Sequence, residues 1–180
     1  MGVYGEMGIK TGLKTLAGFA IWALAVSTPL SVPAAEEESL VTFKVMSPDL
    51  AIELAQATLE ACREKDFQVA VAVVDRFGIV QVILRDQLAG AHTPETARRK
   101  AWTAVSFRTD TLSLGESTKA GNEASGIRFV TDVLMAGGGT PVMAGGSLVG
   151  GVGVSGAPSG ESDDECANEG IEQVSDQLDF

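Results

Sequence analysis

The stretch from residue 68 to residue 107 reads QVAVAVVDRFGIVQVILRDQLAGAHTPETARRKAWTAVSF, and it contains the elements that define the fold. Residues 68–74 are mostly apolar and β-branched, which predicts a strand buried on both faces. Residues 75–78 are typical of a turn with glycine in the last position, and residues 79–84 predict the returning strand. Together these segments predict a β-hairpin.

A polar loop over residues 85–91 separates this hairpin from a helix. Thr93, Pro94 and Glu95 have the composition of a helix start, with a capping hydroxyl, a proline in the first turn and an acid near the positive end of the helix dipole. The helix is expected to reach about Phe107. A stripe of small residues, which would let this helix lie close to a sheet, is formed by Ala97, Ala101 and Ala104.

Further elements are predicted on either side. Residues 47–64 begin with Ser-Pro-Asp and predict a helix. Residues 141–154 predict a second hairpin, with its turn at Gly145 and Gly146. An acidic run precedes a final helix expected from about Ser162 to near Leu178.

Residues 109–135 are rich in glycine and are expected to be irregular. Asp110 can cap a short helix there, and residues 127–134 can contain another short element. The predicted order is helix, hairpin, helix, irregular segment, hairpin and helix. Hairpins imply a mostly antiparallel sheet with helices packed on it, which is the α+β class.

The N-terminal segment differs from the rest of the chain. Lys10 and Lys14 precede an apolar run over residues 16–30, and the small residues Ala34 and Ala35 follow it. This order is typical of a secretory signal peptide, whereas a membrane-spanning helix needs about 20 apolar residues.

We therefore expect residues 1–34 to be a cleaved signal peptide, residues 35–46 an N-terminal leader of the mature chain, and residues 47–180 a single domain. Translation can begin at Met1 or at Met7. The mature protein is expected to be periplasmic or secreted, with no stable membrane insertion after cleavage. The formal net charge of −11 excludes nucleic acid as a main partner, because the phosphate backbone repels an acidic chain.

Two features resemble known motifs without matching their context. Residues 151–156 read GVGVSG and fit GxGxxG, yet these glycines lie in a predicted strand and do not open a helix, which argues against dinucleotide binding. Glycines here favour the close approach of another backbone or of a flat ligand. The only histidine is His92 and no GxSxG is present, so a histidine-based hydrolase is disfavoured.

Cys62 and Cys166 lie in two predicted helices near the ends of the mature chain. An exported protein lives where disulfides form, so the two residues can be bonded. Two separate buried thiols are the alternative. A metal site built on these cysteines is disfavoured, because neither belongs to a CxxC and no paired histidines are present.

Two longer stretches have a family resemblance. The segment VAVAVVDRFGIVQVILRDQLAGAHTPETARRKAWTA resembles the central motif of the GlcG/HbpS family. The segment GGGTPVMAGGSLVGGVGVSGAPSGESDDECANEGI resembles the C-terminal signature of the same family. The resemblance covers about residues 47–175 and is weakest over 110–135.

The resemblance implies a profilin-like antiparallel sheet flanked by helices, and it implies assembly into homo-oligomers. For exported members it implies haem binding, with sequestration, sensing or degradation of the haem as the role. Other members act beside glycolate or propanediol enzymes, or are fused to a corrinoid adenosyltransferase. A non-haem accessory or enzyme acting with a small carboxylate or corrinoid, and an oligomeric interaction module, are therefore alternatives.

Haem binding needs an axial ligand and cations for the propionates. His92 is the expected iron ligand, and it lies in a loop that we expect to be exposed. Thr93 and Thr96 are expected to offer weak oxygen ligation or hydrogen bonds, and Arg98 and Arg99 to meet a propionate. The solvated face of a helix is the alternative for these two arginines. No catalytic residue is predicted, and covalent haem attachment is excluded because no CxxCH is present.

Overall fold

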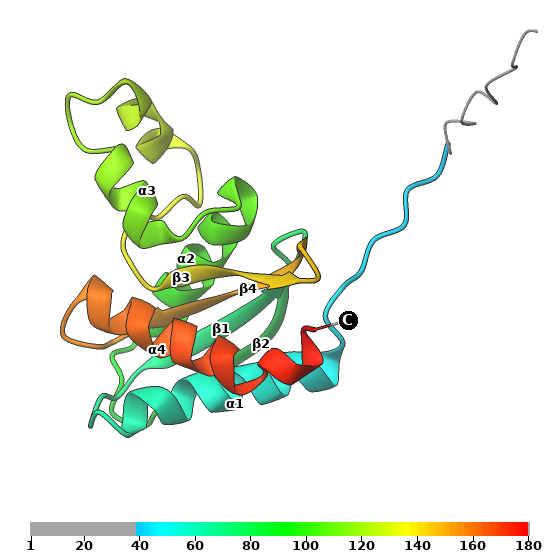
Figure 1. The fold of residues 1–180 in the computed structure, drawn as a ribbon. Helices are drawn as coiled ribbons and strands as arrows, with labels where there is room; N and C mark the ends of the chain where they lie inside the picture. Colours follow the sequence, from blue (N-terminus) through cyan, green and yellow to red (C-terminus); the bar gives the residue numbers. More distant parts are fainter. Residues whose placement is uncertain (1–38, 180) are drawn as a thin grey trace, which may run out of the picture. The chain divides into compact units, whose positions relative to one another are not determined.

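Four antiparallel strands form a sheet in the order β2-β1-β4-β3 (Figure 1). The computed structural model describes residues 39–179, and the unit from Val41 onward contains all the elements below. The strands are β1 (Ala70–Asp75), β2 (Val80–Arg85), β3 (Gly139–Ala144) and β4 (Ser147–Ser155). The helices are α1 (Pro48–Arg63), α2 (Thr93–Phe107), α3 (Thr111–Ser117) and α4 (Gly160–Gln173), with 3-10 turns η1 (Glu123–Phe129) and η2 (Ser175–Gln177). The α+β prediction is confirmed.

The turn between β1 and β2 forms as its sequence predicts. One carboxylate oxygen of Asp75 accepts hydrogen bonds from the backbone N–H groups of Phe77 at 2.8 Å and Ile79 at 2.9 Å. Gly78 adopts a left-handed φ of 82°, which a residue with a side chain rarely adopts. The turn directs β2 back along β1, and the buried strand and the returning strand of the predicted hairpin are both confirmed.

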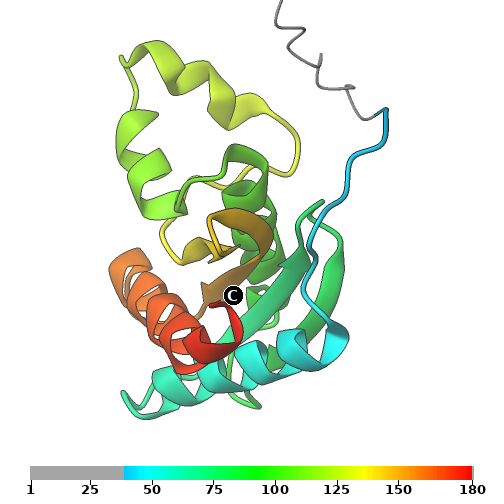
Figure 2. The ribbon, with the colours of Figure 1, turned by 45° about the vertical axis from the view of Figure 1, so that its right-hand side comes forward.

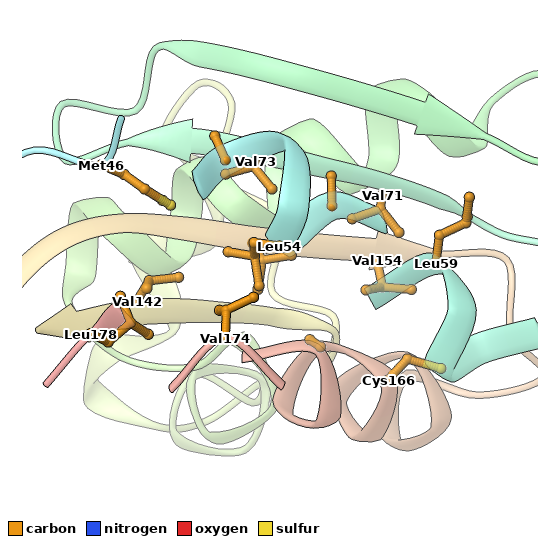
Figure 3. Packing of buried hydrophobic residues seen from close by; sticks show 14 of the residues in the cluster. Met46, Leu54, Leu59, Val71, Val73, Val142, Val154, Cys166, Val174 and Leu178 are labelled. Atoms are coloured by element: carbon orange, nitrogen blue, oxygen red, sulfur yellow. The ribbon is translucent and has the colours of Figure 1, made fainter. Parts of the chain in front are cut away.

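The two faces of the sheet are covered by different helices. Figures 1 and 2 show α1 and α4 side by side on one face, with α2 on the other. The main core lies between the sheet and the α1–α4 pair, where the side chains labelled in Figure 3 converge. Residues 109–135, which include α3 and η1, project away from the sheet in both ribbon views.

Glycines in β4 set how closely α2 approaches the sheet. A Cβ atom on Gly153 would lie 2.1 Å from the carbonyl oxygen of Ala97. A Cβ atom on Gly151 would lie 2.6 Å from a methyl group of Val105 and 3.2 Å from the carbonyl oxygen of Ala101. Of the two explanations for these glycines, the close approach of another backbone therefore holds, and no room for a flat ligand remains on this face of β4.

Cys62 and Cys166 form a disulfide that links α1 to α4, with their Cα atoms 5.3 Å apart. Both residues are fully buried in the main core. The structure thus selects the bonded state from the two alternatives left by the sequence.

The last helix begins two residues before its expected start and ends earlier than predicted. The side chain of Ser159 accepts a hydrogen bond from the N–H of Ser162 and caps α4, whose first residue is Gly160. The helix ends at Gln173 and continues only as η2. In the irregular segment, Asp110 caps α3 as expected. The second short element is a 3-10 turn centred before residues 127–134, because no side chain of that turn is buried to hold a longer helix.

The expected signal peptide lies outside the described residues. Met46, which we expected in the leader, is only 3% exposed and joins the main core. Among residues 39–179, no helix combines the length and the apolar composition that are needed to cross a bilayer.

Candidate functional site

The loop between β2 and α2 presents His92 at the first turn of the helix. His92 occupies the N-cap position of α2, and its side chain is exposed, as the sequence predicts. Within residues 39–179 its imidazole makes no hydrogen bond and no ion pair, although the ring lies against Gly90. A neutral imidazole in this state can accept a metal or a polar ligand.

Asp86 anchors the start of this loop. It is only 4% exposed, and its Oδ1 accepts hydrogen bonds from the Arg63 guanidinium at 2.7 and 3.0 Å. Its Oδ2 accepts from the backbone N–H of Val69 at 3.2 Å. These contacts join the loop to α1 and to the residue before β1, and they satisfy a buried carboxylate that would otherwise be costly.

Backbone carbonyl groups fix the rest of the loop. The Arg85 guanidinium donates to the carbonyl oxygens of Gln87 and Ala89. The N–H of Thr93 donates to the carbonyl oxygen of Gly90 at 3.0 Å. The loop that carries His92 is therefore held by internal hydrogen bonds at both ends.

Thr93 and Thr96 lie in the same turn as His92 but serve the helix. Thr93 is 1% exposed and its hydroxyl donates to the carbonyl oxygen of Gly90 at 2.8 Å. The hydroxyl of the half-buried Thr96 donates to the carbonyl oxygen of His92 at 3.0 Å. Thr93 is thus the less accessible of the two as a ligand.

Arg98 is engaged by two carboxylates. It donates to both oxygens of Glu95 at 2.7 and 2.8 Å, and to Oδ1 of Asp132 at 2.8 Å. The hydrogen bond to Glu95 is the main reason that the pKa of Arg98 is raised above its ordinary value. The same contact holds the pKa of Glu95 below its usual range.

Arg99 binds the backbone of the projecting segment. Its guanidinium donates to the carbonyl oxygens of Asp132 at 3.2 Å and Val133 at 2.7 Å. Lys100 turns away from both arginines and is only 3% exposed. The three consecutive cations therefore have three different surroundings. They form neither one solvated helix face nor one shared binding site for a ligand.

The structure places His92, Thr93 and Thr96 together at the first turn of α2, while Arg98 and Arg99 contact residues 132–133. The largest cleft that we describe, of about 620 Å³, lies elsewhere, between residues 43–47, the start of α1, the β3–β4 hairpin and η2. The lining of this cleft contains no histidine or cysteine, whereas the exposed imidazole of His92 can ligate iron. His92 is therefore the better candidate for an iron site.

Sequence reasoning missed the residues that hold the site in place. Arg85 and Asp86 stand in the motif that resembles the family, but nothing in the sequence assigns their contacts. Asp132 is out of reach of local patterns, because it meets Arg98 across 34 positions of the chain.

Comparison with known proteins identifies the family. The family model described as haem degrading protein HbpS-like matches residues 46–172. This chain belongs to the HbpS-like family. The match covers both hairpins, the His92 loop and all four α-helices except the last residue of α4, so the resemblance inferred from the sequence is confirmed.

Two solved structures of the HbpS-like fold are informative. A double mutant of HbpS from Streptomyces reticuli is 37% identical with a TM-score of 0.72, covering 78% of this chain and 94% of that one. A complex of PduOC with haem is 32% identical with a TM-score of 0.67, covering 71% of this chain and 94% of that one.

This chain is also similar to part of a corrinoid adenosyltransferase. The corrinoid adenosyltransferase PduO of Salmonella typhimurium is 32% identical over 124 residues, which are 68% of this chain. The match spans only 37% of the length of that relative. The similarity therefore concerns one part of the transferase.

Proposed function

We propose that this chain is an exported haem-binding protein, with His92 as the iron ligand and no catalytic residue of its own. The exposed imidazole of His92 carries this proposal. It is the only imidazole in the chain, and it stands on a loop that internal hydrogen bonds hold in place. The HbpS-like family and the haem complex of PduOC support haem as the ligand.

The loop that carries His92 also offers apolar surface, which supports a largely apolar ligand. Leu88 is 83% exposed in the same loop and offers apolar surface. Haem would supply an iron that accepts a lone pair from the imidazole. The hydroxyl of Thr96 already donates to the carbonyl oxygen of His92, so toward a ligand it would act only as an acceptor.

For Arg98 or Arg99 to bind a haem propionate, the present partners of the arginine would have to be exchanged. Arg98 is already bound by two carboxylates, so a propionate would have to replace Asp132 or Glu95 as its partner. Such an exchange conserves charge, because one carboxylate replaces another. Arg99 would have to release the carbonyl oxygens of residues 132–133, which makes Arg98 the better candidate.

Titration of the purified protein with hemin, followed in the Soret region, tests the proposal. The parent is expected to form a complex with a defined Soret maximum. His92→Ala should move that maximum and weaken binding by about tenfold or more, since orienting partners of metal-bound histidines alone are worth 10–100-fold. Glu172→Ala, at an exposed position of α4, is the control and should behave as the parent.

Two results would contradict the proposal in different ways. A parent protein that gives no hemin complex would remove haem as the ligand. A His92→Ala variant that keeps both the spectrum and the affinity would leave haem in place but exclude His92 as the ligand. Conversion of hemin to a verdin-like product by the parent would add degradation to binding.

We further propose that the mature protein is a homo-oligomer. The support is family resemblance together with exposed apolar side chains on the edge strand β2, at Val80 and Ile83. Light scattering at tens of micromolar tests this, and a strictly monomeric mass would contradict it.

A corrinoid is the second candidate ligand, and the similarity to PduO favours it. Titration with cobalamin under the same conditions distinguishes the two ligands. Spectral changes that depend on His92 with cobalamin and not with hemin would transfer the proposal to the corrinoid.

A further inference from the structure

Gly90 lies directly beneath the imidazole of His92. A Cβ atom added to Gly90 would lie 2.7 Å from Cε1 and 2.9 Å from Nδ1 of the ring. Both distances are shorter than any contact that a real Cβ atom makes. The next nearest atom, a methyl carbon of Thr93, would be 3.7 Å away. The space above Gly90 is thus occupied by the imidazole and by little else.

These distances define which edge of the ring faces the protein. The Nδ1–Cε1 edge lies nearest to the Cβ position of Gly90, and Nε2 is not among the three atoms nearest to that position, the third of which is 3.7 Å away. The two nitrogens of a histidine are distinct, and the surroundings of one decide which of them meets a ligand. Nε2 is the ring nitrogen farther from the Cβ position of Gly90.

The backbone of Gly90 does not itself require glycine. Its φ lies outside the left-handed region, in which Gly78 and Gly156 are found. The backbone of Gly90 is also held in place, because its carbonyl oxygen accepts two hydrogen bonds from Thr93. A side chain at position 90 would therefore displace the exposed imidazole and leave the loop in place.

We propose that Gly90 is a positioning residue for His92, which lets the imidazole rest on the backbone through its Nδ1 edge and directs Nε2 toward the ligand. This inference rests on the proposed function for the role of the ligand, but the placement of the ring can be tested without haem. On this proposal Gly90 orients an exposed side chain that has no hydrogen bond of its own, as the orienting partner of a metal ligand does.

Gly90→Ala is the decisive variant, and Gly126→Ala is its matched control. Gly126 also lies outside the left-handed region, and a Cβ atom there would meet nothing within 4 Å. In hemin titration, Gly90→Ala is expected to weaken binding about tenfold, as the loss of an orienting partner does, and Gly126→Ala to have no effect. The same pair is compared in the His92→Ala background.

The double variant separates positioning from a general effect on the loop. If Gly90 acts through the imidazole, Gly90→Ala adds nothing once the imidazole is gone, and the two substitutions are not additive. If Gly90→Ala weakens hemin binding equally in both backgrounds, the proposal is overturned.

Long-range proton–nitrogen NMR of the haem-free protein gives a second readout, and the single histidine makes its signals unambiguous. Gly90→Ala should shift the Nδ1 and Cε1–H signals of His92, whereas Gly126→Ala should leave them unchanged. Unchanged signals in Gly90→Ala overturn the positioning role whatever hemin does. Shifted signals in a protein that binds no hemin support the positioning role and contradict the proposed function alone.

Discussion

Lys100 and Asp163 form an ion pair with a 2.7 Å contact, buried between α2, β4 and α4. Lys100 also donates to the carbonyl oxygen of Val154 at 2.9 Å, and Asp163 accepts from the N–H of Ala157 at 3.0 Å. Burial raises the pKa of the Asp163 carboxyl, and the ammonium of Lys100 opposes that shift. The pair joins the two helical layers across the end of β4.

Lys100→Met should lower the free energy of unfolding by about 3–5 kcal/mol, because it leaves a buried carboxylate without its cation. Chemical denaturation followed by circular dichroism measures this. Lys119→Met is the control, since Lys119 pairs with Glu116 at the exposed surface and should change stability little. Equal effects of the two variants would show that the buried pair contributes nothing special.

Removal of the disulfide should also destabilise the protein. The cross-link closes a loop of 104 positions, so Cys62→Ala with Cys166→Ala should lower the free energy of unfolding by about 2–5 kcal/mol. Thiol titration of the native protein is expected to find no free thiol before reduction and two after it. Two reactive thiols in unreduced protein purified from the periplasm would count against the bond.

Arg99→Ala should loosen the segment that its guanidinium holds. Thr103 donates its hydroxyl to the carbonyl oxygen of Arg99 and accepts from the N–H of Leu134, so that amide reports on the contact. Its hydrogen exchange should accelerate about tenfold or more, because hydrogen bonds from a charged donor are worth about 1.5–3 kcal/mol each. Arg108→Ala, at the exposed end of α2, should leave this exchange unchanged.

The carboxyl group of Asp164 should titrate above its ordinary value of 3.8, because burial and the nearby charge of Asp110 both raise its pKa. Protonation is then favoured in the folded protein. The contribution of this group to the free energy of unfolding is fully present below pH 3.8. It is lost as the pH rises through the raised pKa of the folded protein.

Asp110→Asn should lower the pKa of Asp164 and reduce that loss, and asparagine keeps the cap of α3. Carbon-detected NMR titration of the carboxyl group measures the shift, with Glu172→Gln as an exposed control. An Asp164 pKa that is the same in Asp110→Asn and in the parent would contradict the role of the neighbouring charge.

The mature protein should begin near Ala35 when it is expressed with its own leader. The positive end, apolar run and small residues of the N-terminal segment give this expectation. Mass spectrometry of the periplasmic and cytoplasmic fractions measures it. Recovery of soluble protein that still begins at Met1 or Met7 would contradict export with cleavage.

Local chemistry made much of the fold predictable. The turn at Asp75 and the cap at Asp110 are determined by residues that lie within four positions of each other, so their sequences predict them directly. The exposure of His92 followed in the same way, from a polar loop that ends in a helix start. The N-terminus of α4 was less predictable. Ser159 and Ser162 are both suitable N-cap residues, and only Ser159 caps the helix.

Long-range pairing was beyond the sequence. Arg98, Arg99 and Lys100 are consecutive, yet apart from Glu95 beside Arg98 their partners lie 33 or more positions away in different segments. The disulfide could not be predicted either. Helix patterns show neither which faces of α1 and α4 meet nor which residues of the two helices lie opposite each other. The orienting role of Gly90 was hidden because a glycine in a loop is ordinarily explained by its backbone.

The contact between Gly153 and Ala97 also bears on the placement of His92. Helix α2 approaches the sheet most closely at Ala97, five positions after His92 in the same helix. A methyl group at position 153 would overlap the carbonyl oxygen of Ala97, so that α2 would have to move and would carry the imidazole at its first turn with it. A substitution inside the sheet would thus change the position of the proposed iron ligand without contacting it.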